Sequence, residues 1–207
     1  MASRIIHTCI AIEICKVIDI PDKKRFFYGN ILPDIVSLYH GSKDLSHFKG
    51  EPQSEFYTPF NYNSFYTKYK DKMSDSVYLG YLMHLIADDI WLRKIYIPYV
   101  KVNISENNKS ELIKKYYTDF LKLNIFLIPK FNIKKDCVES VNDIPIEEIN
   151  TTSKYSDMLI KEFGKDFRVY GKKYLDPILL EKLSILEYIE YTSKFCIEKI
   201  KELNLIE

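Results

Sequence analysis

The sequence predicts an all-α protein, a multihelical bundle formed by one domain of 207 residues. Three observations support this fold class. Apolar residues recur at helical spacing along most of the chain, as in the series Ile6, Ile10 and Ile14. Only 6 glycines and 8 prolines are present, which is too few for the many tight turns of a β-sandwich. The sequence also contains no internal repeat, low-complexity tract or convincing β-hairpin pattern.

The composition excludes several classes of protein. Hydrophobic residues make up 46% of the chain and charged residues 29%, so a sizeable core is expected and intrinsic disorder is not. Lysine and arginine total 30 against 29 aspartates and glutamates, which argues against a duplex-DNA binder and against recruitment to anionic membranes. The apolar stretches 4–18 and 77–100 contain charged residues, so neither a signal peptide nor a transmembrane segment is expected. The sequence therefore predicts a cytoplasmic protein, and its Lys, Ile, Tyr and Asn bias is typical of an AT-rich bacterial genome.

The first part of the chain is expected to form two helices, a turn and a loop. Ser3 is a possible N-cap for a helix over residues 3–18, which Pro21 terminates. A short helix over residues 22–28 would end before Gly29, a residue suited to the position after a helix. The segments that follow are expected to be a turn over residues 29–35 and a long polar loop with short helical pieces over residues 40–60.

The clearest helical pattern covers residues 75–96, with Ser74 or Asp75 as the N-cap and Pro98 as the end. A later helix is expected to start at Ser105, also as an N-cap. The remaining expected segments are helices over residues 63–72, 105–123, 153–163 and 177–203, and an irregular stretch over residues 126–149. A domain boundary in that stretch is conceivable, but the pattern favours a single domain with additional helices over residues 105–205.

The four cysteines do not indicate a metal site or a disulfide framework. No pair has the CxxC spacing of a thiolate zinc site, and no secretory signal is expected. They are expected to be buried or half-buried free thiols, and they are Cys9, Cys15, Cys137 and Cys196.

His84 and Asp88 give the strongest local signal for chemistry. In a helix, residues 80, 84 and 88 fall on one face, so both side chains can bind the same metal ion. Gly80 would leave room on that face for a neighbouring backbone or a ligand. The residues around the pair are apolar, and burying polar groups without compensation is costly. This context favours a metal ion over the alternative interpretation, a simple salt bridge between His84 and Asp88.

Three further side chains are candidate metal ligands. His7 lies mid-helix among isoleucines and is either a ligand or a core histidine bonded to a carbonyl. His47 lies in the polar loop, and Asp34 follows a proline in an apolar segment, where a carboxylate needs a partner. His40, beside a glycine, is interpreted as a surface histidine. Imidazole and carboxylate ligands together indicate zinc first, with iron or manganese as alternatives.

An aromatic segment allows two interpretations. Its rings either line a groove for a lipid or a nucleobase, or pack the bundle against the helix over residues 75–96, and packing is favoured. The rings are Phe56, Tyr57, Phe60, Tyr62, Phe65, Tyr66 and Tyr69.

The order of these motifs resembles the zinc-dependent phospholipase C family, which shares a helical fold with the zinc-dependent single-strand nucleases. The resemblance covers residues 3–96 and rests on the segments Ile-Ile-His7-Thr, Phe-Phe-Tyr-Gly-Asn-Ile-Leu-Pro-Asp34, Ser-His47-Phe and Gly-Tyr-Leu-Met-His84-Leu-Ile-Ala-Asp88. It implies that one zinc ion is held by Asp34, His47, His84 and Asp88. It also implies that a second zinc ion would use His7, with Asp88 bridging the two ions.

The sequence departs from the family pattern at two points. The family also holds the second metal with an N-terminal tryptophan, whereas this chain begins Met-Ala-Ser. The family's third metal uses two histidines and a glutamate after the His-x-x-x-Asp helix, but no histidine follows His84 here. Glutamates or aspartates would have to replace those ligands for a third site to form.

The resemblance implies a hydrolase of small phosphoesters or phospholipid-like substrates, in which a metal-activated water attacks phosphorus. Asp34 would hold or deprotonate that water, and Asp88 would serve both metals. Arg25 and Arg93 are candidate phosphate-binding residues. The alternative is a non-catalytic, degenerate metal-binding protein with a structural zinc. A phosphohydrolase of the His-Asp doublet class is less favoured, because no adjacent His-Asp pair occurs.

Overall fold

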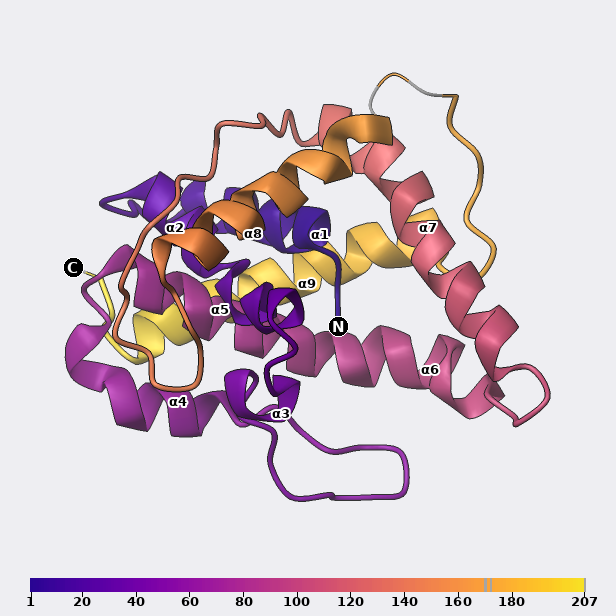
Figure 1. Ribbon diagram of the computed structural model, residues 1–207, viewed down its shortest axis with the longest axis horizontal. Helices are drawn as coiled ribbons and strands as arrows, with labels where there is room; N and C mark the ends of the chain where they lie inside the picture. Colours follow the sequence, from indigo (N-terminus) through magenta and orange to yellow (C-terminus); the bar gives the residue numbers. More distant parts are fainter. Residues whose placement is uncertain (170, 172, 207) are drawn as a thin grey trace.

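The computed structural model describes residues 1–169, 171 and 173–206, and its regular elements in these ranges are all helical (Figure 1). This confirms the predicted all-α class. The α-helices are α1 (Arg4–Cys15), α2 (Lys23–Gly29), α3 (Lys43–Ser46), α4 (Tyr62–Tyr69), α5 (Ser76–Trp91), α6 (Ile97–Tyr99), α7 (Lys109–Lys130), α8 (Ser153–Asp166) and α9 (Lys182–Glu202). Short 3₁₀ helices are η1 (Leu32–Leu38), η2 (Lys70–Lys72), η4 (Lys101–Asn103) and η5 (Phe167–Val169), and η3 (Leu92–Tyr96) is a π-helix.

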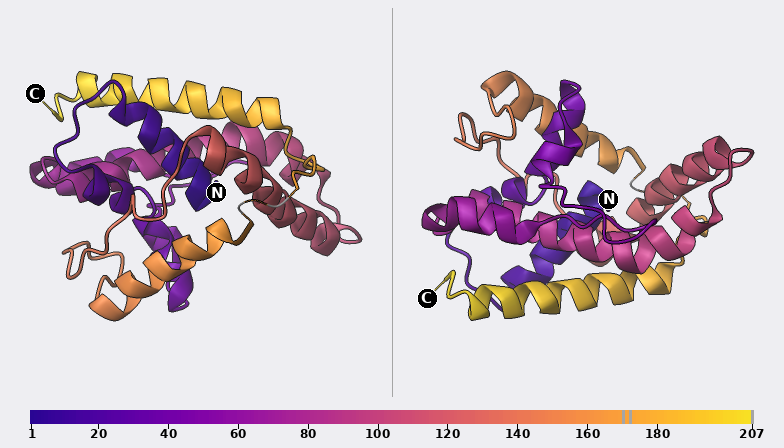
Figure 2. Two further views of the ribbon diagram at one scale, coloured as in Figure 1. Left: turned by 90° about the horizontal axis from the view of Figure 1, so that it is seen from above. Right: turned by 90° about the horizontal axis from the view of Figure 1, so that it is seen from below.

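Helix α5 lies at the centre of the molecule, and every one of its residues is buried. A helix that is apolar on all sides is stable only when neighbours cover all of them. Here α2 and α4 pack on α5, and α9 packs on both α1 and α5. Figure 2 shows α9 along one side of the molecule and α8 on the opposite side. The few polar side chains of α5 are therefore forced into the interior.

The backbones of α2 and α5 touch at two glycines. A Cβ atom on Gly80 would lie 2.2 Å from the carbonyl oxygen of Phe26, and one on Gly29 would lie 2.1 Å from that of Val77. The prediction that Gly80 leaves room for a neighbouring backbone is thus confirmed. The prediction that Gly29 occupies the position after the helix is wrong, because Gly29 is the last residue of α2 and is required for this close approach.

Two predicted N-caps are confirmed. The Ser3 side chain accepts a hydrogen bond from the backbone N–H of Ile6 at the start of α1. The Asp75 carboxylate accepts one from the N–H of Val77 at the start of α5, with a distance of 2.9 Å. In both cases the capping residue directly precedes an apolar helix, which is why the local pattern was sufficient.

The predicted limits of α7 are wrong at both ends. Ser105 does not cap the helix, because its N–H donates to the side chain of Asn108 and α7 begins only at Lys109. The helix also continues through Pro129 to Lys130, into the segment predicted to be irregular. Its apolar stripe explains the extension, because Leu127 and its neighbours are buried against the core. Likewise, the helical path after α5 continues past the predicted end at Pro98, which lies within α6.

The aromatic segment mainly packs the bundle, as predicted. Phe65 is buried and stacks on Tyr81 of α5, with ring centroids 4.5 Å apart, and Tyr69 packs against Tyr78. The four cysteines are free, as expected. Across the described residues, no helix has the length and apolar character that crossing a bilayer requires, in line with the absence of a predicted transmembrane segment.

The segment before α9 is held by Asp119, a buried carboxylate of α7 that accepts the backbone N–H groups of Ile178, Leu179 and Leu180. Asp119→Ala is expected to lower the free energy of unfolding by about 3 kcal/mol, because three amide donors lose a charged acceptor. Urea denaturation measures this loss. The matched control is Asp136→Ala, since Asp136 is exposed and its removal should change stability little. A loss below about 1 kcal/mol would show that water replaces the carboxylate without cost.

Candidate metal centre

Three nitrogen and oxygen atoms from two segments form a triangle in the interior. His84 and Asp88 lie one turn apart on α5, with His84 Nε2 3.3 Å from Asp88 Oδ2. His47, directly after α3, places its Nε2 3.3 Å from His84 Nε2 and 3.5 Å from Asp88 Oδ2. Tetrahedral zinc with bonds of about 2.0–2.1 Å has ligand–ligand edges of roughly 3.3–3.4 Å. The triangle therefore has the size of one face of a zinc tetrahedron.

Asp34 supplies a fourth atom. It lies in the first turn of the 3₁₀ helix η1, so the prediction of an irregular turn at this position is wrong, and its Oδ1 is 3.8 Å from His47 Nε2. This oxygen is buried without a hydrogen-bond partner, as is Asp88 Oδ2. The ligand atoms of Asp34, His47 and His84 all lie within 4.8 Å of one another. Buried carboxylate oxygens without donors are a favourable environment for a cation.

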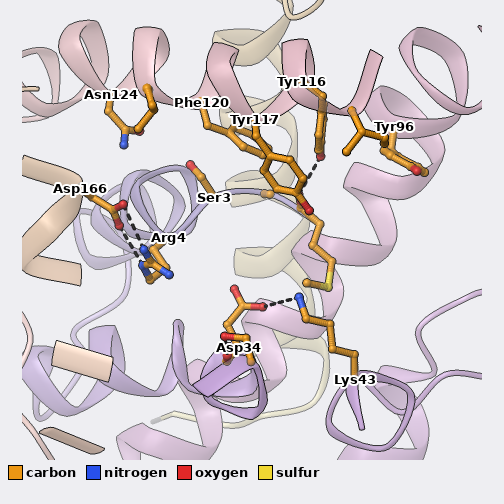
Figure 3. A pocket seen from close by; sticks show the side chains of 15 residues that line it. Ser3, Arg4, Asp34, Lys43, Tyr96, Tyr116, Tyr117, Phe120, Asn124 and Asp166 are labelled. Carbon is orange, nitrogen blue, oxygen red and sulfur yellow. Dashed lines mark hydrogen bonds and ion pairs between the residues drawn. The ribbon is translucent and has the colours of Figure 1, made fainter. Parts of the chain in front are cut away.

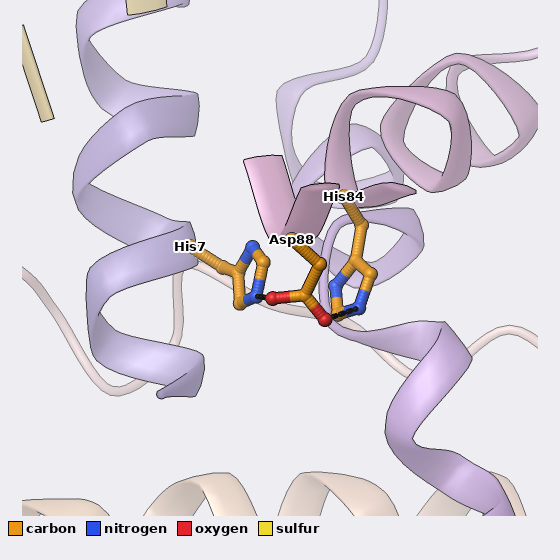
Figure 4. Close-up of side chains that lie close together, drawn as sticks. All are labelled: His7, His84 and Asp88. Atoms are coloured by element: carbon orange, nitrogen blue, oxygen red, sulfur yellow. Dashed lines mark hydrogen bonds and ion pairs between the residues drawn. The ribbon is translucent and has the colours of Figure 1, made fainter. Parts of the chain in front are cut away.

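His7 joins the cluster from α1 (Figure 4). Its Nε2 is 3.2 Å from Asp88 Oδ1, and its ring stacks on His84 with centroids 4.0 Å apart. His7 Nδ1 has no partner, so the interpretation of a core histidine bonded to a carbonyl is wrong. His7, His84 and Asp88 form a second group that could hold a metal ion. In this group Asp88 Oδ1 already accepts the backbone N–H of Ala2 at 2.9 Å.

Hydrogen bonds on the far side of two rings fix their orientation. His84 Nδ1 lies 2.9 Å from the carbonyl oxygen of Asn30, which can only accept, so Nδ1 carries the hydrogen. His47 Nδ1 lies 2.8 Å from the hydroxyl of Ser46, which itself donates to the Lys43 carbonyl. When both rings are neutral, their Nε2 lone pairs face each other. Such second hydrogen bonds are typical of metal-ligating histidines.

The electrostatic environment keeps the carboxylates ionised. Burial alone would raise the pKa of Asp88, but His84, His7 and His47 outweigh it and hold the pKa well below its ordinary value. Burial, assisted by the neighbouring His84, lowers the pKa of His7; burial is also the largest cause of the lowered pKa of His47. The pKa of His84 is raised, because Asp88 and Asp34 outweigh its burial. Ionised carboxylates and neutral imidazoles are the forms that bind metal ions, so the shifts prepare Asp88, His7 and His47 for a cation, whereas His84 releases its proton when one binds.

The cluster borders a cavity of about 540 Å³ through Asp34, whose side chain is 12% exposed. Two cations that the sequence did not single out also line this cavity. Arg4 is paired with Asp166, with Nε 2.8 Å from Oδ2, and Lys43 Nζ lies 3.7 Å from Asp34 Oδ1. Arg4 lies on α1 one turn before His7, a spacing that could have indicated a shared face.

The phosphate-binding residues predicted from sequence are not at the cavity. Arg25 Nη2 is 2.6 Å from the Asp75 carboxylate, and Arg93 pairs with Asp89. Asp89 also accepts hydrogen bonds from the Tyr57 hydroxyl at 2.8 Å and from a backbone N–H of the same loop. It therefore holds the loop that follows His47 rather than contacting the cluster. The fourth histidine, His40, is exposed, as predicted.

Both metal-ligand groups share His84, and the described part of the chain contains no other group of three His, Cys, Asp or Glu side chains at this spacing. The sequence-predicted ligands His7, Asp34, His47, His84 and Asp88 are thus brought together at one place in the fold. Comparisons of the chain with protein-family models, with curated proteins and with solved structures found no match.

Proposed function

We propose that the chain is a metal-dependent phosphoester hydrolase with one zinc ion bound by Asp34, His47, His84 and Asp88. The observation that carries the proposal is the triangle of His47, His84 and Asp88, with edges of 3.3, 3.3 and 3.5 Å, next to a cavity lined by two cations. Two nitrogens and two carboxylate oxygens are a ligand set that zinc accepts. The motif order shared with the zinc-dependent phospholipase C family supports the same assignment.

Each residue has a distinct role in the proposed reaction. A bound zinc ion supplies a water of lowered pKa and positive charge opposite the phosphate. Asp34, the candidate ligand that lines the cavity, would hold that water and accept its proton. Arg4 and Lys43 bind phosphate oxygens, and Asp166 fixes the orientation of Arg4 with a second contact at 3.1 Å. A small phosphoester fits a cavity of this size.

The position beside His7 supports a second zinc ion less well. Of its three candidate ligands, His84 is shared with the first position, and Asp88 Oδ1 already accepts the Ala2 N–H. A structural zinc without catalysis is the second candidate function. It is favoured by the complete burial of His47, His84 and Asp88. Metal content and hydrolysis, measured on the same sample, separate the two functions.

Protein purified without chelator or a metal-affinity column is expected to contain about one zinc ion per chain by mass spectrometry. At a zinc concentration a hundredfold above Kd, stabilisation of about 2.7 kcal/mol should raise the Tm of the metal-free protein by roughly 5–10 °C. His84→Ala should lose both the metal and this shift. His40→Ala is the matched control, since His40 is exposed and lies outside both ligand groups.

Absence of stoichiometric metal, or a zinc-dependent Tm shift in His84→Ala equal to that of the parent, would refute the metal centre. Hydrolysis of bis-p-nitrophenyl phosphate by the same sample, lost with chelator and restored by zinc, supports the hydrolase. Stoichiometric zinc without any hydrolysis would instead support the structural role.

A further inference from the structure

The cavity beside the metal centre has two chemically different walls (Figure 3). Arg4, Asp34 and Lys43 form a charged wall at the metal centre. The opposite wall comes from α7, and Figure 3 shows Tyr117 and Phe120 directed from that helix toward the charged side. A ligand that fills the cavity therefore meets charge at one end and aromatic rings at the other.

The aromatic wall is the outer face of a packed cluster. Tyr116 lies 4.7 Å from Phe120 and 5.5 Å from Tyr117 between ring centroids, and Trp91 supports Phe120 from behind. The Trp91 indole N–H donates to the Tyr116 hydroxyl, which in turn donates to the Met1 carbonyl oxygen. These bonds hold the inner rings in place. Tyr117, the outermost ring, is 62% exposed, and Phe120 is 8% exposed.

We propose, on the basis of the proposed function, that this site selects phosphoesters that carry a planar aromatic group, which packs on Tyr117 and Phe120. Aromatic rings attract one another at centroid distances of about 4.5–7 Å, and the cluster already uses this spacing. A further ring on the exposed face of Tyr117 continues the series. Tyr116 and Phe120 hold one face of Tyr117 by ring packing, so part of its side-chain entropy is already lost before a ligand packs on the other face.

The charged wall fixes where the phosphate lies. Arg4 uses Nε and Nη2 to contact Asp166, and no acceptor for Nη1 is present among the described residues. Nη1 is therefore free to donate to a phosphate oxygen. Lys43 supplies a second positive charge from the other side of Asp34. Aliphatic side chains, Ile113 and Leu121, also line the cavity, so an acyl or alkyl phosphoester is the competing ligand.

Two inhibitors with the same charged group test the selectivity. Phenylphosphonate and hexylphosphonate, added to the hydrolysis of bis-p-nitrophenyl phosphate, share a phosphonate and differ only in the organic group. We expect an inhibition constant about tenfold lower for phenylphosphonate, which corresponds to one aromatic packing interaction of about 1.4 kcal/mol. Tyr117→Leu should abolish the difference, and Tyr117→Phe should retain it. Tyr191→Leu, which removes an exposed tyrosine of α9, is the matched control.

A binding measurement separates this inference from the hydrolase itself. Calorimetry with phenylphosphonate and hexylphosphonate on the zinc-loaded protein should give a Kd about tenfold lower for the phenyl compound, again removed by Tyr117→Leu. This preference without any hydrolysis would support the aromatic site while the proposed activity fails. Hydrolysis with equal or stronger inhibition by hexylphosphonate, or a preference unchanged in Tyr117→Leu, would overturn the aromatic site and leave the hydrolase standing.

Discussion

Asp88→Asn is expected to reduce zinc-dependent hydrolysis of bis-p-nitrophenyl phosphate by at least about a thousandfold. The Asp88 carboxylate contacts all three histidines of the cluster, with Oδ2 toward His84 and His47 and Oδ1 toward His7. An amide keeps the shape but removes the negative charge and replaces one oxygen by an N–H₂ donor, which repels a cation. Each factor of ten in rate corresponds to about 1.36 kcal/mol, so weakening the metal by about 4 kcal/mol suffices.

The experiment compares zinc content, melting temperature and rate in the same preparations. Asp88→Asn should contain less zinc than the parent, and excess zinc should recover only part of the rate. Asp44→Asn is the matched control. Asp44 is an exposed carboxylate of α3, the helix that directly precedes His47, and it should not bind the metal. The parental rate is itself expected to be low, since the described residues contain no third ligand group. An unchanged rate in Asp88→Asn would place the chemistry elsewhere.

Two of the candidate metal ligands were predictable from sequence because their signal is local. His84 and Asp88 are one helical turn apart in a segment that is otherwise apolar, so the helix had to bury both. Asp34 and His47 were found through motif order, but their distances to His84 depend on how η1 and α3 pack on α5. His7 had two interpretations, and only its contact with Asp88 decided between them.

Arg4, a cation that lines the cavity, was not predictable, because its partner is distant in sequence. Arg4 is held by Asp166, 162 positions later, and no local pattern reports such a pair. Arg93, by contrast, pairs with Asp89 one turn away, a spacing visible in the sequence that argues against a free phosphate ligand. An acidic residue one helical turn away thus indicates that an arginine is already paired. The sequence showed such a residue for Arg93 but not for Arg25, whose partner is Asp75.

The helix boundaries also differ in whether a local signal or a tertiary contact sets them. Starts fixed by a capping side chain beside an apolar run, as at Ser3 and Asp75, were correct. The start and end of α7 were not, because burial of Leu127 extends that helix past the point where its propensity declines. Gly29 was assigned a local, post-helical role, although its requirement comes from the backbone of α5. Tertiary contact, not turn chemistry, explains that glycine.

Gly80→Ala is expected to destabilise the protein by more than about 3 kcal/mol. The new methyl group would lie 2.2 Å from the Phe26 carbonyl oxygen and 2.8 Å from the Asn30 amide nitrogen. Both atoms belong to the backbone of α2 and its C-cap, so no side-chain rotation can relieve the contact. In most buried helices this substitution is favourable, because alanine has the higher helix propensity. The sign of the effect therefore reports directly on the contact between α2 and α5.

The same substitution should weaken zinc binding without touching a ligand. Asn30 donates its side-chain amide to the Gly80 carbonyl at 3.2 Å, and its own carbonyl accepts from His84 Nδ1. Pushing α2 away removes the group that orients His84, a type of loss that typically costs 10–100-fold in metal affinity. Urea denaturation and zinc titration measure the two effects. Gly164→Ala is the matched control in α8, where the nearest atom is the flexible end of the Lys135 side chain, and it should be neutral or slightly stabilising. Equal stability of Gly80→Ala and the parent would mean that α2 does not pack against α5 at this point, and the position assigned to Asn30 behind His84 would fall with it.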